Sequence, residues 1–220
     1  MKMQTEQTIR IQSATAQIEG MLAVPENAAG VVLFAHGSGS GRFSPRNQFV
    51  AKTLRDGGLG TLLVDLLAAE ESEDRQNVFN TALLAERLVS ATEWLRKSPE
   101  TAKLSIGYFG ASTGAAAALR AAVNTGQFVR AIVSRGGRPD LAIRYLPGIT
   151  VPTLLIVGGD DYSVIPLNRT ALDALAGPKE MVIIPGATHL FEESGALEQV
   201  AECARDWFLK YLPPETRPAM

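Results

Sequence analysis

The sequence predicts one α/β domain, with a mostly parallel, twisted sheet of about eight strands and helices on both faces. From about residue 30 onward, short apolar runs alternate with longer segments of helical periodicity, which is typical of such a sheet. The 220 residues are 46% hydrophobic and 20% charged, enough to bury one substantial core. No repeat, low-complexity segment or long linker divides the chain. We therefore expect residues 1–220 to form a single domain, with a frayed tail over residues 212–220, where three prolines occur.

The elements can be placed in order along the chain. Residues 8–13 and 16–23 are extended segments joined by a tight turn, which predicts an antiparallel edge. Six apolar runs follow, each short enough for a strand buried on both faces: 31–35, 60–64, 104–109, 131–134, 153–157 and 181–184. Apolar side chains at three- and four-residue spacing predict two amphipathic helices that cover the sheet, over residues 79–95 and 197–211.

Charge and cysteine content limit the classes of function. With 21 basic and 23 acidic residues, the net charge of -2 supplies no field to hold a nucleic acid or an anionic membrane, so a small molecule fits better. The single cysteine, Cys203, cannot form an internal disulfide, and no cysteine and histidine cluster could bind zinc. Residues 1–16 lack the pattern of a signal peptide, and no apolar stretch has membrane-spanning length. We expect a cytoplasmic monomer or homodimer that needs no metal or cofactor.

Ligands of such sheets bind at the carboxyl ends of the strands, so residues that follow the apolar runs are candidates for function. Ser112 lies there in a G-x-S-x-G pattern, between an apolar run and an alanine-rich helix start. The glycines at 110 and 114 permit a sharp, crowded turn that holds the serine above the sheet. The N–H of Thr113 and the helix dipole would then face an oxyanion. The alternative is that Ser112 only caps the helix.

A nucleophilic serine needs a base, and the chain has two histidines. His189 follows the last apolar run in a loop from which its imidazole could reach Ser112, whereas His36 fits better as a brace for the loop after the first apolar run. A carboxylate fixes the tautomer of such a base. Asp160 and Asp161 both follow the fifth apolar run, and adjacent residues point in different directions. The pattern alone leaves both aspartates open.

A second glycine-rich segment, residues 37–41, follows the first apolar run. It lacks the lysine and the glycine spacing of phosphate-binding loops. Backbone N–H groups that stabilise an oxyanion are therefore the better interpretation of this loop.

From about residue 16 to residue 211 the chain resembles the α/β-hydrolase superfamily, and within it the small, lidless group similar to dienelactone hydrolase. The matching motifs are His36-Gly37, Gly110-x-Ser112-x-Gly114, Gly158-x-x-Asp161-x-x-Val164-x-Pro166 and Gly186-x-x-His189. The resemblance implies Ser112 as nucleophile, His189 as general base and then acid, and Asp161 as the acid member. It also implies an oxyanion hole formed by the backbone N–H groups of Thr113 and Ser38. Dienelactone hydrolases proper use a cysteine nucleophile, whereas this position is a serine here.

These assignments predict a serine esterase that cleaves a small carboxylic ester through an acyl-enzyme. A thioesterase, an amidase or an acyltransferase could use the same triad, and a non-catalytic binding protein of this fold is a further alternative. The segment 135–150 is too short for a lid, which predicts an open cleft. Arg42, Arg135 and Arg138 fall near strand ends and could bind a substrate carboxylate. Their alternative role is in surface ion pairs with Glu70, Glu71 or Asp140.

Overall fold

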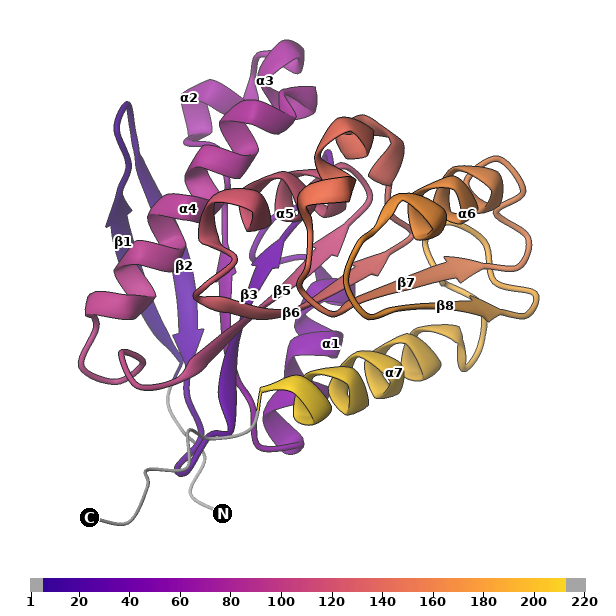
Figure 1. The fold of residues 1–220 in the computed structure, drawn as a ribbon. Helices are drawn as coiled ribbons and strands as arrows, with labels where there is room; N and C mark the ends of the chain where they lie inside the picture. Colours follow the sequence, from indigo (N-terminus) through magenta and orange to yellow (C-terminus); the bar gives the residue numbers. More distant parts are fainter. Residues whose placement is uncertain (1–5, 213–220) are drawn as a thin grey trace.

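Eight strands form one sheet in the computed structural model, which describes residues 6–212 (Figure 1). The strands are β1 (Gln7–Gln12), β2 (Gln17–Ala23), β3 (Gly30–Ala35), β4 (Gly60–Val64), β5 (Ser105–Ala111), β6 (Val129–Arg135), β7 (Thr153–Gly158) and β8 (Lys179–Ile184). Their order across the sheet is β1-β2-β4-β3-β5-β6-β7-β8. β2 runs antiparallel to β1 and to β4, and the other neighbouring strands are parallel. The predicted antiparallel edge and mostly parallel sheet are confirmed.

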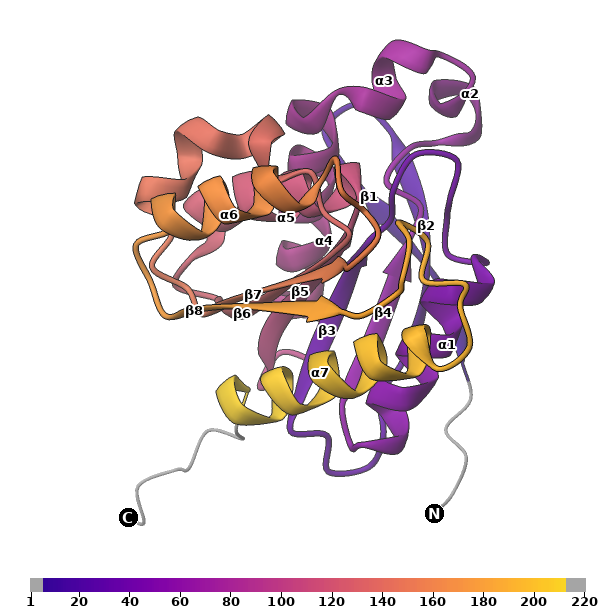
Figure 2. The ribbon, with the colours of Figure 1, turned by 90° about the vertical axis from the view of Figure 1, so that its right-hand side faces the viewer.

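Helices cover both faces of this sheet, as expected. Figure 2 shows α1 (Pro45–Asp56) and α7 (Ala196–Tyr211) on one face. The other face carries α4 (Thr81–Lys97), α5 (Thr113–Thr125) and α6 (Ile165–Ala174). The short helices α2 (Ala69–Ser72) and α3 (Arg75–Phe79) follow β4. A 3-10 helix, η1 (Pro139–Gly148), is the one helix between β6 and β7, so no lid domain is inserted there within residues 6–212, as expected.

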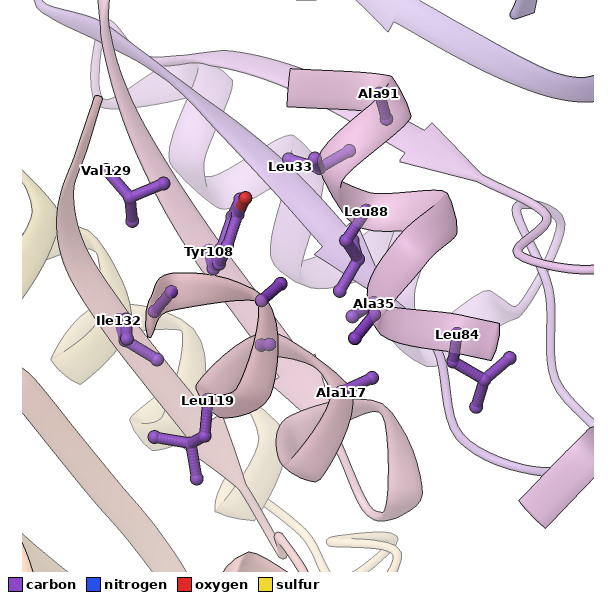
Figure 3. Packing of buried hydrophobic residues seen from close by; sticks show 14 of the residues in the cluster. Leu33, Ala35, Leu84, Leu88, Ala91, Tyr108, Ala117, Leu119, Val129 and Ile132 are labelled. Atoms are coloured by element: carbon purple, nitrogen blue, oxygen red, sulfur yellow. The ribbon is translucent and has the colours of Figure 1, made fainter. Parts of the chain in front are cut away.

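The core has two layers because the central strands alternate their side chains between the two faces of the sheet. Leu33 and Tyr108 point toward α4 and α5, where they pack with residues such as Leu88 and Leu119 (Figure 3). The next residues along the same strands, Phe34 and Phe109, belong to the opposite layer with α1 and α7. The burial of these strands on both faces is confirmed, and it gives the carboxyl ends of β3 and β5 a rigid base.

Three expectations are corrected at the margins of the fold. β8 is not buried on both faces, because it is an edge strand whose one neighbour within residues 6–212 is β7. The long helix begins at Thr81 rather than at residue 79, because Asn80 accepts hydrogen bonds from two N–H groups of the first turn and so caps α4. Leu212 is fully buried against β3 and β5 and is not part of a frayed tail; residues 213–220 lie outside the described residues.

The helices also bear on the question of membrane insertion. Within residues 6–212, no helix combines the length and the apolar character needed to cross a bilayer.

Candidate active site

Ser112 occupies a strained turn between β5 and α5. Its backbone φ is 50° and ψ is -120°, a conformation that residues other than glycine rarely adopt. A Cβ added at Gly114 would collide with the carbonyl oxygen of Ala35, and one at Gly110 would lie 2.5 Å from Cα of Ala115. The two glycines of the motif therefore allow the crowded turn that the sequence predicts. A hydrogen bond also joins the turn to the end of β6, since the N–H of Ser112 donates to the carbonyl of Arg135 at 3.2 Å.

The side chain of Ser112 does not cap α5. The residue stands at the N-cap position, but no side-chain capping hydrogen bond forms there. Oγ of Ser112 lies instead 3.3 Å from Nε2 of His189. The capping alternative is therefore wrong, and the serine is free to face the imidazole.

The second nitrogen of this imidazole contacts a carboxylate. Nδ1 of His189 lies 2.7 Å from Oδ2 of Asp161, whose side chain is 8% exposed. With the proton on Nδ1, the ring donates to Asp161 and turns the lone pair of Nε2 toward Ser112. Asp160 points elsewhere and accepts a hydrogen bond from the hydroxyl of Tyr162 at 2.9 Å. The structure thus brings Ser112, His189 and Asp161 together and leaves Asp160 outside.

Backbone contacts fix the relative position of the histidine loop and the aspartate loop. The N–H of Gly159 donates to the carbonyl of Ile184 at 2.8 Å, and the N–H of Asp160 donates to the carbonyl of Ala187 at 2.9 Å. These two bonds join the end of β7 to the segment that carries His189. The contact between imidazole and carboxylate is therefore set by main-chain geometry rather than by two free side chains.

The loop after β3 adjoins the serine on its other side. A Cβ added at Gly37 would lie 3.0 Å from Cβ of Ser112. Within residues 6–212, the backbone N–H groups of Ser38 and Thr113 donate to no protein acceptor. Thr113 begins α5, so its N–H belongs to the unpaired first turn of a helix. The residue after the serine and a residue of the adjoining loop thus each keep an unpaired N–H, which is the type of donor that an oxyanion hole uses.

Contacts across the sheet hold this loop in place. Nε2 of His36 accepts the N–H of Leu66 at 3.0 Å, and Nδ1 contacts the carbonyl oxygen of Gly37 at 2.9 Å. Burial lowers the pKa of His36, outweighing the opposing effects of the Gly37 carbonyl and of Asp65. The interpretation of His36 as a brace is supported. Asp65 adds a second brace, since it accepts the N–H of Arg42 at 2.7 Å and also pairs with the Arg42 guanidinium.

The three arginines proposed to contact substrate differ sharply. Arg42 pairs with Asp65 and with Glu19, and Arg138 is bound to Asp140 by two hydrogen bonds of 2.8 and 2.9 Å. Arg135 is 7% exposed, and its Nε and Nη1 have no partner within residues 6–212. Burial, and to a smaller extent the charge of Arg46, lower the pKa of Arg135 to about 10. Among these three arginines, Arg135 is therefore the one whose guanidinium is not already paired with a protein carboxylate within residues 6–212.

Two supporting residues were not identified from the sequence. In the sequence, Asp65 is recognisable only as the residue that follows an apolar run, because its partner Arg42 lies 23 positions earlier in the chain. Asn168 in α6 is fully buried, and its Nδ2 donates to the carbonyl of Gly137 at 3.1 Å. This bond ties the helix after Asp161 to the loop after β6. The one sequence signal that could have indicated this role is an asparagine on the apolar face of a predicted helix, because a polar side chain in that position needs a hydrogen-bond partner.

A cleft of about 820 Å³ opens beside the loop after β3. Its lining includes Ser38 and Gly39 from that loop, together with parts of β2, the end of β4 and the segment of α2 and α3. Ser112, Asp161 and His189 do not line it. The cleft therefore meets the candidate site at Ser38.

The family comparison covers nearly the whole chain. Residues 18–212 match the model of the Dienelactone hydrolase family. The crystal structure of dienelactone hydrolase from Anabaena variabilis ATCC 29413 is 52% identical and superposes with a TM-score of 0.93, covering 96% of this chain and 99% of that one. XC6422 from Xanthomonas campestris, described as an a/b serine hydrolase without lid, has a TM-score of 0.77 at 17% identity and covers 97% of both chains. This second likeness concerns the fold alone.

Curated relatives carry a different name. Two proteins of Mycobacterium tuberculosis, from strains CDC 1551 / Oshkosh and ATCC 25618 / H37Rv, are each named "Putative phosphoribosyl transferase" and are 52% identical over 207 residues. The match covers 94% of this chain and 47% of each relative. The chain thus spans about half the length of these relatives.

Proposed function

The chain belongs to the dienelactone hydrolase family, and from this premise we propose that it is a serine hydrolase that cleaves carboxylic esters through an acyl-enzyme. The observation that carries the proposal is the run of contacts from Ser112 through His189 to Asp161, at 3.3 and 2.7 Å. A hydroxyl, an imidazole and a carboxylate in this order form the constellation that makes a serine nucleophilic at neutral pH.

The first half of the reaction uses each of these groups. Oγ of Ser112 attacks the ester carbonyl carbon while Nε2 of His189 takes the hydroxyl proton. The negative charge moves to the carbonyl oxygen, where the N–H groups of Thr113 and Ser38 stabilise it. The intermediate collapses, the bond to the alkoxy oxygen breaks, and the imidazolium of His189 protonates the departing alcohol. Asp161 stabilises the imidazolium through Nδ1.

Water completes the second half. His189 removes a proton from a water molecule, whose oxygen attacks the acyl carbon on Ser112. The second tetrahedral intermediate breaks the bond to Oγ, and His189 returns the proton to the serine. The carboxylic acid leaves and the free enzyme is restored. These reaction steps use no metal or cofactor. Because no lid is inserted between β6 and β7, water can reach the acyl-enzyme.

Arg135 supports a proposal about one end of the substrate. Its buried guanidinium has no carboxylate partner within residues 6–212, and its carbonyl is bonded to the N–H of Ser112. We propose that an acyl group bearing a carboxylate binds there. Arg42 and Arg138 are less suited, because carboxylates of the protein already occupy them.

The same proposal extends to the setting in which the enzyme works. Its partner is a small ester rather than a nucleic acid or a membrane, and a monomer or homodimer suffices. The free, half-buried Cys203 fits the reducing environment of the cytoplasm. Phosphoribosyl transfer is not assigned to this chain, because that name belongs to relatives of which it spans about half, while its own residues 18–212 match the hydrolase family.

A fluorophosphonate probe tests the proposal directly, because it labels only an activated serine. We expect the label on Ser112 of the wild type and none in Ser112→Ala, with ester turnover reduced by about 10⁴-fold or more. Comparing esters, thioesters and amides of one acyl group by kcat/KM then separates an esterase from a thioesterase or amidase. Undiminished turnover in Ser112→Ala would refute the assignment.

A further inference from the structure

We propose that the cleft beside Ser38 binds one end of the substrate and accepts a bulky group that is uncharged or cationic, but not an anionic one. The inference rests on the proposed serine hydrolase function, because it assigns the cleft to the same reaction. It deepens that function by naming the chemical class of one half of the ester.

The strand order places the cleft next to the reacting atoms. The cleft lies at the ends of β2, β4 and β3. Ser112 follows β5, which pairs with β3 on one side and with β6 on the other. Arg135, at the end of β6, therefore lies across Ser112 from the cleft. An ester carbonyl held by the N–H of Ser38 would extend one of its two ends into the cleft.

The size and floor of the cleft fit a bulky organic group. Its volume of about 820 Å³ falls within the roughly 300–1,000 Å³ of pockets that hold drug-sized ligands. Its lining includes the apolar side chains of Ile18, Leu67, Val78 and Leu84, and the exposed ring of Phe43 stands at the same cleft. Methyl or ethyl groups would leave most of this surface uncovered.

The charges of the lining argue against an anion. Arg42 is the basic side chain among the lining residues, and its guanidinium is already paired with Asp65 and with Glu19. Arg10, outside the lining, adds a contact of 3.6 Å to Glu19. Glu70 also lines the cleft and is in no ion pair within residues 6–212. Since burial lowers the pKa of His36, this histidine supplies no positive charge near neutral pH. Among the described residues that line the cleft, a ligand carboxylate would meet an excess of negative charge and no unpaired cation.

A blocking variant tests whether the cleft binds substrate. Ala69 is an exposed lining residue on α2, so Ala69→Trp can fill the cleft without disturbing the core. We expect the ratio of kcat/KM for bulky esters to kcat/KM for methyl acetate to fall by about tenfold or more, because only the bulky group needs the filled space. Lys97→Trp, at the exposed end of α4 outside the lining, is the matched control and should leave this ratio unchanged.

A series of esters tests the charge preference. One set varies the alcohol, as acetate esters of choline, of 3,3-dimethylbutanol and of 4-hydroxybutanoate; the other places the same three groups on the acyl side. In the set that Ala69→Trp impairs, we expect the cationic and neutral members to exceed the anionic one by about tenfold in kcat/KM. Glu70→Gln should narrow this difference about threefold.

The outcomes separate the inference from the proposed function. If Ala69→Trp impairs neither set, or the anionic member is preferred in the set it impairs, the cleft assignment is wrong while labelling of Ser112 by fluorophosphonate still supports a serine hydrolase. If the wild type turns over no ester and Ser112 stays unlabelled, the proposed function fails and the cleft assignment fails with it.

Discussion

The imidazole of His189 faces Oγ of Ser112 at 3.3 Å, although 77 residues separate them in the chain. The loop that carries His189 is bonded through its backbone to the end of β7, and the turn that carries Ser112 is bonded through its backbone to the end of β6. The contact therefore follows from the packing of neighbouring strand ends.

Replacing the carboxylate that contacts His189 should harm catalysis far more than replacing its neighbour. Asp161 contacts Nδ1 of His189, whereas Asp160 contacts Tyr162. We expect Asp161→Asn to lower kcat by about 10³- to 10⁴-fold, because the tautomer and the imidazolium lose their stabilising charge. Asp160→Asn should stay close to the wild type. Steady-state kinetics of the two variants would contradict the assignment if the losses were equal or reversed.

Loosening the loop after β3 should weaken stabilisation of the oxyanion rather than substrate binding. Asp65 holds this loop through the N–H and the guanidinium of Arg42. With methyl acetate, which is too small to fill the cleft that Asp65 also lines, we expect Asp65→Ala to lower kcat about tenfold or more with a smaller change in KM, because the N–H of Ser38 loses its fixed position. Binding of a boronic acid, which mimics the tetrahedral intermediate, should weaken in parallel with kcat.

Lys52→Ala is the control for this variant, since it removes the exposed ion pair between Lys52 and Asp56 on α1. A change in melting temperature without a change in kcat or boronate affinity would show that Asp65 serves stability alone.

The buried His36 should make stability depend on pH. Burial lowers its pKa in the folded state below the ordinary value of 6.5, so the unfolded chain binds a proton first as pH falls. Stability linked to His36 is thus fully present above pH 6.5 and is lost as pH falls from there toward the lowered pKa. Urea unfolding at pH 7.5 and 5.5 should show a larger loss in the wild type than in His36→Gln. Equal losses in both proteins would exclude this role.

Removing the guanidinium beside the turn should change the preference for charged acyl groups. We expect Arg135→Met to lower the kcat/KM ratio of carboxylate-bearing to neutral acyl esters by about tenfold or more, because a desolvated charge pair is lost. Methionine keeps the bulk of the side chain. Arg138→Ala is the control, since Asp140 already binds that guanidinium. An unchanged ratio in Arg135→Met would remove Arg135 from the substrate site.

The apolar runs and the glycines of the turn were sufficient to predict the strands and the place of Ser112. Their information is local, because a run of buried residues or a G-x-S-x-G turn imposes its own backbone geometry. The pairing of Arg42 with Glu19 and Asp65 could not be predicted, because it depends on β2 and β4 becoming neighbours. The exposure of β8 likewise depends on strand order, which the apolar pattern of residues 181–184 does not contain.

Because φ of Ser112 is positive, the residue that favours stability at this position differs from the residue that catalysis needs. Glycine adopts a positive φ without steric conflict, so Ser112→Gly should relax the turn and make the folded protein harder to melt. The same change would delete the hydroxyl that lies 3.3 Å from Nε2 of His189. Selection for heat resistance alone would therefore favour glycine at position 112. Variants that keep Ser112 would be recovered only if the selection also measured turnover.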